Sequence, residues 1–219
     1  MIQGAIFDFD GTLFDSMGIW DTAGKDYLQS VNRVAAEDLQ DTLKTMSLYQ
    51  SACYLQKAYQ ISQSVEAIMA GINRVVEDFY FHTAQPKPGV GDLLELLRRQ
   101  DVKLCIATAT DRYQVEAALR RCGLSQFFQA ILTCTEVGHG KEQPQIFRAA
   151  LALLQTHRTN TIVVEDALHA IQTAKADGFI TVAVYDSHET NQQKVQSLAD
   201  FYLPDYSDLR AFQKFALCF

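Results

Sequence analysis

The fold of this chain is decided by one short stretch near its start, Ala5-Ile6-Phe7-Asp8-Phe9-Asp10-Gly11-Thr12. Its first three residues are apolar and predict a buried strand, which ends where the carboxylates begin. Gly11 permits a tight turn directly after this strand. Such a turn would bring Asp8 and Asp10 to flank one ligand.

Beyond residue 84 the chain alternates between apolar runs and helical patterns. We expect strands at residues 102–107, 130–132, 161–164 and 181–184, and helices at residues 90–100, 113–121, 145–155, 167–176 and 189–198. This alternation is typical of repeated strand–helix units. It predicts an α/β fold of the Rossmann-like kind, in which a parallel sheet is covered by helices on both faces.

Residues 17–83 follow a different pattern. They contain no proline, and apolar residues recur at helical spacing, as at Ile68, Ile72 and Val76. We therefore expect an inserted, all-helical cap domain here. Residues 1–16 and 84–219 would form the α/β catalytic core domain.

The composition limits what the protein binds and where it works. The formal net charge of −7 repels nucleic acid and anionic membrane surfaces. The five cysteines show no paired spacing of the kind found in zinc or dithiol sites, and we interpret them as reduced thiols. We see no signal peptide and no apolar run long enough to span a bilayer, so we expect a cytoplasmic protein. Whether it is a monomer or a weak dimer stays open.

Polar residues follow several of the predicted strands, at the sheet edge where parallel sheets bind ligands. They are Asp8 and Asp10, Thr108, Lys141, and the pair Glu165-Asp166. Carboxylates crowded at one edge repel each other unless a cation lies among them. Mg²⁺ suits Asp8, Asp166 and a carbonyl group of the Asp10 turn.

The same residues favour chemistry on a small phosphorylated metabolite. Lys141 and the Thr108 hydroxyl would bind phosphate oxygens that the ion leaves free. One carboxylate of the Asp8/Asp10 pair can attack phosphorus, while the other donates a proton to the leaving oxygen and later deprotonates water.

In order and position, these four motifs resemble those of the haloacid dehalogenase superfamily, in its phosphatase and beta-phosphoglucomutase-like branch with a helical cap. The resemblance implies that Asp8 forms an aspartyl phosphate and that Asp10 is the general acid and base. It also implies that phosphate is bound by Thr108, Ala109 and Lys141, and that the cofactor Mg²⁺ is bound by Asp8, Asp10 and Asp166, with Glu165 touching the ion directly or through water.

Three regions depart from the family pattern or carry a second interpretation. The stretch Gly140-Lys141-Glu142-Gln143-Pro144-Gln145 replaces the more usual proline and acidic residues, and Glu142 adds negative charge beside the lysine. We expect Thr110 and Asp111 to begin the following helix. We expect Trp20 to belong to the core of the cap rather than to line a site.

Two alternative functions remain open at this point. A phosphosugar mutase of the beta-phosphoglucomutase type would share the aspartyl phosphate, but it would have a histidine a few residues after the first motif. This chain has none before His82, so we favour hydrolysis. The other alternative is a non-enzymatic phosphoacceptor or phosphate-binding regulatory protein. In a phosphoacceptor domain the phosphorylated aspartate lies inside the chain without a second carboxylate to help hydrolysis, whereas Asp8 and Asp10 here follow the first strand. A phosphate-binding protein on the same scaffold would be expected to lack one of the catalytic groups, and all of them are present.

Overall fold

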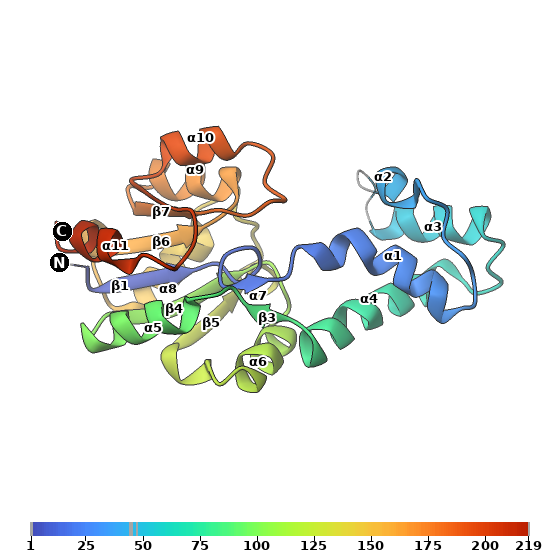
Figure 1. Cartoon of the computed structure of the whole chain (residues 1–219), viewed down its shortest axis with the longest axis horizontal. Helices are drawn as coiled ribbons and strands as arrows, with labels where there is room; N and C mark the ends of the chain where they lie inside the picture. Colours follow the sequence, from blue (N-terminus) through green and yellow to red (C-terminus); the bar gives the residue numbers. More distant parts are fainter. Residues whose placement is uncertain (1, 44–45, 47, 219) are drawn as a thin grey trace. The chain divides into compact units, whose positions relative to one another are not determined.

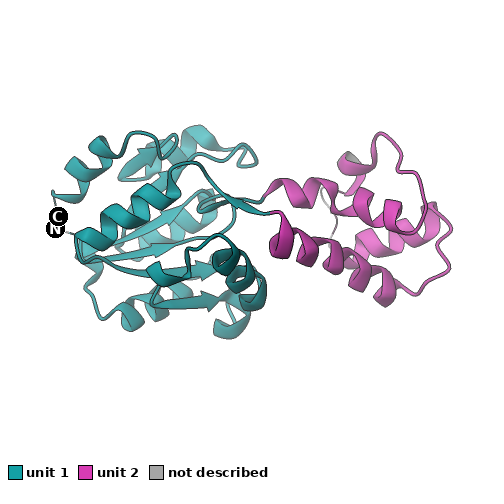
Figure 2. Ribbon diagram, turned by 60° about the horizontal axis from the view of Figure 1, so that its bottom comes forward, with its two compact units in different colours: residues 1–16, 84–219 teal, residues 17–83 magenta. Residues whose placement is uncertain are grey.

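The chain folds into two compact units, seen in a computed structural model that describes residues 2–43, 46 and 48–218. One unit comprises Met1–Ser16 together with Ala84–Phe219, and the other comprises Met17–Thr83 (Figure 2). The roles of catalytic core and cap that we assign to these units stay predictions.

The first unit is built on a parallel sheet of six strands in the order β5-β4-β1-β6-β7-β8 (Figure 1). The strands are β1 (Gly4–Phe7), β4 (Lys103–Thr108), β5 (Ala130–Thr133), β6 (Thr161–Glu165), β7 (Ile180–Val184) and β8 (Phe201–Leu203). This confirms the α/β fold predicted from the sequence. The three-residue β8 lies at an edge of the sheet and was not expected.

Both faces of the sheet are buried. The helices of this unit are α5 (Val90–Arg99), α6 (Arg112–Arg121), α7 (Cys134–Val137), α8 (Gln145–Leu154), α9 (Leu168–Ala176), α10 (Gln192–Leu198) and α11 (Leu209–Ala216). On one face, Ile6, Cys105 and Val163 form a core with residues of α8 and α9. The residues that alternate with them, such as Ala5 and Leu104, are equally buried and point to the other face.

One helix begins later than its sequence pattern suggests. We expected a helix from residue 189, whereas α10 starts at Gln192. The Glu189 carboxylate instead accepts hydrogen bonds from the backbone amides of Leu168 and Asn191, at 2.9 and 2.7 Å. The Glu189 carboxylate therefore binds both the first residue of α9 and the residue that precedes α10.

The order of the strands fixes where ligands can bind. From β1 the chain moves to β4 and β5 on one side of the sheet, and later to β6, β7 and β8 on the other. Such a reversal opens a crevice outside the carboxyl ends of the central strands. Asp8, Thr108 and Glu165 stand at the ends of these strands, so the candidate residues meet at the reversal.

The two units are joined through a pair of very short strands. β2 (Phe14–Asp15) and β3 (Gln85–Pro86) pair antiparallel, Phe14 with Pro86 and Asp15 with Gln85. The chain therefore leaves the first unit and returns to it at the same place.

The regular elements in the described part of the second unit are all helices, joined by loops, as the sequence predicted. Its helices are α1 (Gly18–Ser30), α2 (Leu39–Leu43), α3 (Leu48–Ala58) and α4 (Val65–His82). One side of α4 is buried through Ile68, Ile72 and Val76. Gly71 lets α1 approach α4 closely, because a Cβ atom there would lie 2.4 Å from the ring of Tyr27. No helix in the described residues of either unit is long and apolar enough to cross a membrane.

Candidate active site

Lys141 joins two carboxylates at the carboxyl ends of the central strands. Its Nζ donates to Asp8 Oδ1 and, at 2.6 Å, to Glu165 Oε1. All three side chains are buried, with exposed fractions of 7%, 9% and 1% for Lys141, Asp8 and Glu165. The loop after α7 therefore supplies a cation to acids that follow β1 and end β6.

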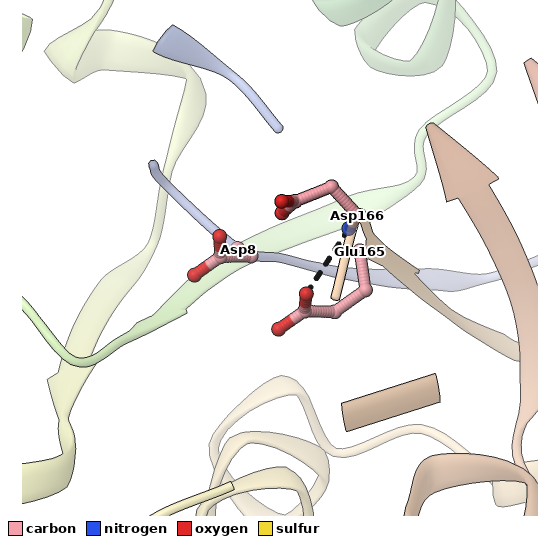
Figure 3. A group of neighbouring side chains, drawn as sticks. All are labelled: Asp8, Glu165 and Asp166. Carbon is pink, nitrogen blue, oxygen red and sulfur yellow. Dashed lines mark hydrogen bonds between the residues drawn. The ribbon is translucent and has the colours of Figure 1, made fainter. Parts of the chain in front are cut away.

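Asp166 completes a compact acidic group with Asp8 and Glu165 (Figure 3). One oxygen from each of the three carboxylates lies within 4.8 Å of the others. Glu165 Oε2 also accepts the backbone amides of Asp166 and Ala167, at 3.1 and 3.2 Å. Both Glu165 oxygens are thus engaged, and this side chain fixes Lys141 and the start of the following loop.

Burial and neighbouring charges shift the pKa values of the groups in this site. Burial raises the pKa of the Asp8 carboxyl group well above its ordinary value, and Lys141 only partly opposes this effect. Burial alone would lower the pKa of Lys141, yet Asp8 and Glu165 raise it above its ordinary value, so the ammonium group stays charged. Three acids around one lysine leave excess negative charge, which protons or a bound cation must neutralise.

Asp10 is held by two hydroxyl groups. Its Oδ1 accepts from Ser16 Oγ at 2.6 Å, and its Oδ2 accepts from Thr110 Oγ1 at 2.5 Å. The expectation for Thr110 was therefore wrong: its side chain binds Asp10, and α6 begins at Arg112 with Asp111 at the N-cap position. The contact draws the loop after β4 to the turn after β1.

Two of the residues predicted to bind phosphate, Thr108 and Ala109, directly precede Thr110, whose side chain binds Asp10. Thr108 ends β4 and is fully buried, and its Oγ1 accepts the amide of Thr110 at 3.0 Å. Ala109 follows it and is exposed. The structure thus gathers Asp8, Asp10 and all the other predicted site residues at one edge of the sheet.

Comparison with known proteins decides the family of this chain. The family model for haloacid dehalogenase-like hydrolases matches residues 5–184. The chain belongs to the haloacid dehalogenase-like hydrolases. The family predicted from the sequence is therefore confirmed, and so is the prediction of a phosphatase-type enzyme.

Individual known proteins resemble the chain over most of its length. A phosphorylated carbohydrates phosphatase from Thermotoga maritima is 25% identical and aligns over 81% of this chain and 82% of its own. Hexitol phosphatase B from Escherichia coli is 26% identical over 96% and 95% of the two chains. A solved structure from T. maritima, described as a candidate beta-phosphoglucomutase, has a TM-score of 0.87 and 23% identity over 97% of this chain and 99% of its own. That likeness shows the fold alone.

In this hydrolase the unusual residue Glu142 folds back over the lysine loop. A Cβ atom on Gly140 would lie 2.3 Å from Glu142 Oε2, so the carboxylate covers the glycine. Lys141 nevertheless keeps both of its carboxylate partners. Pro144 takes the N-cap position of α8. The departure from the family pattern therefore leaves the position of the lysine intact.

The position of Trp20 differs from the one predicted from the sequence. This residue is 54% exposed rather than part of the helical core, and it lines a cavity of about 510 Å³ within the second unit. Lys25, Glu37 and Gln40 line the same cavity. An aromatic face with a few polar groups is typical of small-molecule pockets.

The raised pKa of Asp166 predicts how stability changes with pH. Burial and Glu165 raise this pKa from 3.8 to about 7, although the hydrogen bond from Thr12 opposes the shift. Between these values the folded state keeps a proton that the unfolded state loses, so without divalent ions the contribution of Asp166 to stability should fall as pH rises from about 4 to about 7. Urea unfolding in EDTA at several pH values would measure this.

The matched variant for this prediction is Asp166→Asn, whose amide does not titrate. We expect its stability to decline less with pH than that of the unchanged protein, because Asp8 remains as the second buried acid. Equal slopes for the two proteins would contradict the assignment of the proton to Asp166.

Proposed function

We propose that this protein is a Mg²⁺-dependent phosphatase that hydrolyses the phosphomonoester of a small sugar or sugar alcohol through an aspartyl phosphate on Asp8. The observation that carries this proposal is the buried group of Asp8, Lys141, Glu165 and Asp166 at the reversal of the sheet, with Asp10 held beside it. A nucleophile, a phosphate-binding cation and a separate acid and base are thus within reach of one substrate.

The residues present fit a hard divalent cation. The acidic group offers oxygen ligands only, it is buried, and with its three acids ionised it carries more negative charge than Lys141 balances. Asp8 and Asp166, with a contribution from the Asp10 turn, would hold the ion. Since both Glu165 oxygens already accept hydrogen bonds, we assign Glu165 to Lys141 rather than to the ion. When bound, Mg²⁺ would neutralise negative charge on the transferring phosphoryl group.

The protein side chains would carry out two displacements at phosphorus. An Asp8 oxygen attacks phosphorus, the bond to the leaving oxygen breaks, and Asp10 gives that oxygen a proton. Asp10 then takes a proton from water, the water oxygen attacks phosphorus, and the bond to Asp8 breaks to release phosphate. Lys141, Thr108 and the Ala109 amide bind the phosphoryl oxygens in both steps.

The proposed class of substrate rests on relatives. Two similar proteins are named for phosphorylated carbohydrates and for hexitols. We place the reaction in the cytosol, where the five cysteines, which are free in the structure, would stay reduced.

A substrate panel with two readouts tests this function. Purified protein is given hexitol phosphates, hexose phosphates, phosphoglycolate and p-nitrophenyl phosphate, each with Mg²⁺ and with EDTA. We expect phosphate release that requires Mg²⁺ and is fastest for a sugar or hexitol phosphate. A further sample receives beta-glucose 1-phosphate with a trace of the 1,6-bisphosphate. Rapid formation of glucose 6-phosphate with negligible free phosphate would show a mutase instead.

Replacement of Thr110 by valine tests how Asp10 is positioned. The variant keeps the size of the side chain but removes the donor to Asp10 Oδ2. We expect kcat to fall roughly tenfold, since small errors in the placement of a reacting group are costly. The loss should be greater for alkyl phosphates than for p-nitrophenyl phosphate, because the alkoxide needs the proton more.

Thr173→Val serves as its control. Thr173 also donates its hydroxyl hydrogen bond, to the carbonyl group of His169 at 3.0 Å, but it lies on the exposed side of α9. The Thr173→Val variant should release phosphate at the same rate as the unchanged protein. An unchanged rate in Thr110→Val would remove Thr110 from the description of the site.

A further inference from the structure

Tyr206 reaches the site from the far end of the sequence. It lies in the bend between β8 and α11, and only 2% of its surface is exposed. Its hydroxyl group donates a hydrogen bond of 2.8 Å to the carbonyl oxygen of Thr12. The last loop of the first unit is therefore tied to the turn that follows the first strand.

Thr12 connects Tyr206 to the acidic group through a second hydrogen bond. Its side chain is buried, and Oγ1 donates to Asp166 Oδ1 at 2.9 Å. The neighbouring Gly11 has φ of +74°, and a Cβ atom there would lie 2.6 Å from Asp166 Oδ2. One Asp166 oxygen is thus bonded by this turn, and the other is packed against it.

The position of Tyr206 is itself fixed by close packing. Gly89 has φ of +87°, and a Cβ atom there would lie 2.7 Å from the Tyr206 carbonyl oxygen and 2.8 Å from its Cβ. The backbone of Tyr206 therefore rests directly on the start of α5. Burial raises the pKa of the Tyr206 phenol well above its ordinary value, so the hydroxyl keeps its proton and acts as a donor.

We propose that Tyr206 is a positioning residue for divalent cation binding, because it fixes the Thr12 turn that orients the Asp166 carboxylate. The inference rests on the proposed function, in which Asp166 binds Mg²⁺. Partners that orient a ligand without touching the ion contribute strongly to metal affinity, typically 10- to 100-fold. Without the phenol, the buried Thr12 carbonyl loses its donor and the turn is free to shift.

Direct measurement of metal binding tests this role apart from turnover. Mn²⁺ replaces Mg²⁺, and electron paramagnetic resonance of free Mn²⁺ gives the affinity of the unchanged protein and of Tyr206→Phe. We expect the variant to bind Mn²⁺ about 10-fold or more weakly. In activity assays, saturating Mg²⁺ should restore kcat to within a few-fold, while half-maximal rate should need correspondingly more Mg²⁺.

Tyr27→Phe is the matched control. Tyr27 is also 2% exposed and donates its hydroxyl to a single partner, Gln63 Oε1 at 2.8 Å, but it lies in the helical unit. Its loss should leave Mn²⁺ affinity unchanged. If Tyr27→Phe lost as much Mn²⁺ affinity as Tyr206→Phe, general destabilisation would explain both losses. That result would overturn the inference.

Thr12 variants test the chain of contacts between Tyr206 and Asp166. Thr12→Val should weaken Mn²⁺ binding as Tyr206→Phe does, whereas Thr12→Ser should retain it. If the two residues act through one path, the double variant should lose less affinity than the product of the single losses. If a folded Tyr206→Phe protein bound Mn²⁺ with wild-type affinity, this inference would be overturned while the proposed function would stand. Absence of Mn²⁺ binding in the unchanged protein would overturn the metal assignment of the proposed function as well.

Discussion

Replacement of Asp8 by asparagine is expected to stop turnover, with a loss of at least about 10⁴-fold, while the protein stays folded. The amide is a poor nucleophile, so the first displacement at phosphorus fails. The fold should persist because burial already disfavours the charged form of Asp8, and Lys141 keeps Glu165 as a partner. Phosphate release and circular dichroism measure the two expectations.

Asp92→Asn provides the control for a change from acid to amide. Asp92 lies in the first turn of α5 and is exposed. Its rate should match that of the unchanged protein within a factor of two or so, as expected for an isolated surface substitution. A folded Asp8→Asn protein that released phosphate at the unchanged rate would rule out Asp8 as the nucleophile.

Replacement of Asp10 by alanine should lower the rate by roughly 10²- to 10⁴-fold, the usual contribution of a positioned acid and base. The loss should depend on the leaving group. An alkyl phosphate leaves as a strongly basic alkoxide and needs the proton from Asp10, whereas p-nitrophenolate leaves readily without it. Steady-state rates with both substrates give the comparison.

The comparison has a clear negative outcome. If both substrates lost rate equally, Asp10 would not be protonating the leaving oxygen. The Thr110→Val variant offers a graded check, because it disturbs the placement of Asp10 without removing the carboxylate. Its preference between the two substrates should shift in the same direction, by a smaller amount.

The parts of the fold that rest on local patterns were predictable from the sequence. The strands β1, β4, β6 and β7 are mainly apolar, as expected for strands buried on both faces. The structure places each within one residue or so of its predicted bounds. The long apolar periodicity of α4 likewise indicated the helical insertion. The family motifs supplied the remaining argument, because they fall at the ends of these strands.

Features that depend on distant contacts were not predictable in the same way. β8 has three residues, too few to show alternation, and it becomes a strand only by pairing with β7. Tyr206 meets Thr12 across 194 residues, and no local pattern signals that contact. Thr110 offered a weak signal as a second hydroxyl beside Thr108, but only the folded loops show that it bonds to Asp10.

The pairing of β2 with β3 has a consequence for how the helical unit of this protein could be exchanged. Residues 17–83 leave and re-enter the first unit through two neighbouring strands, so their ends meet at one point. A segment with adjacent ends can be exchanged for another without interrupting the sheet that carries it, as domain insertions in general tolerate. Under the proposed function, such an exchange would alter the helical unit while leaving the buried acidic group of the first unit in place. A chimaera joined at Asp15 and Gln85 would reproduce that exchange in the laboratory.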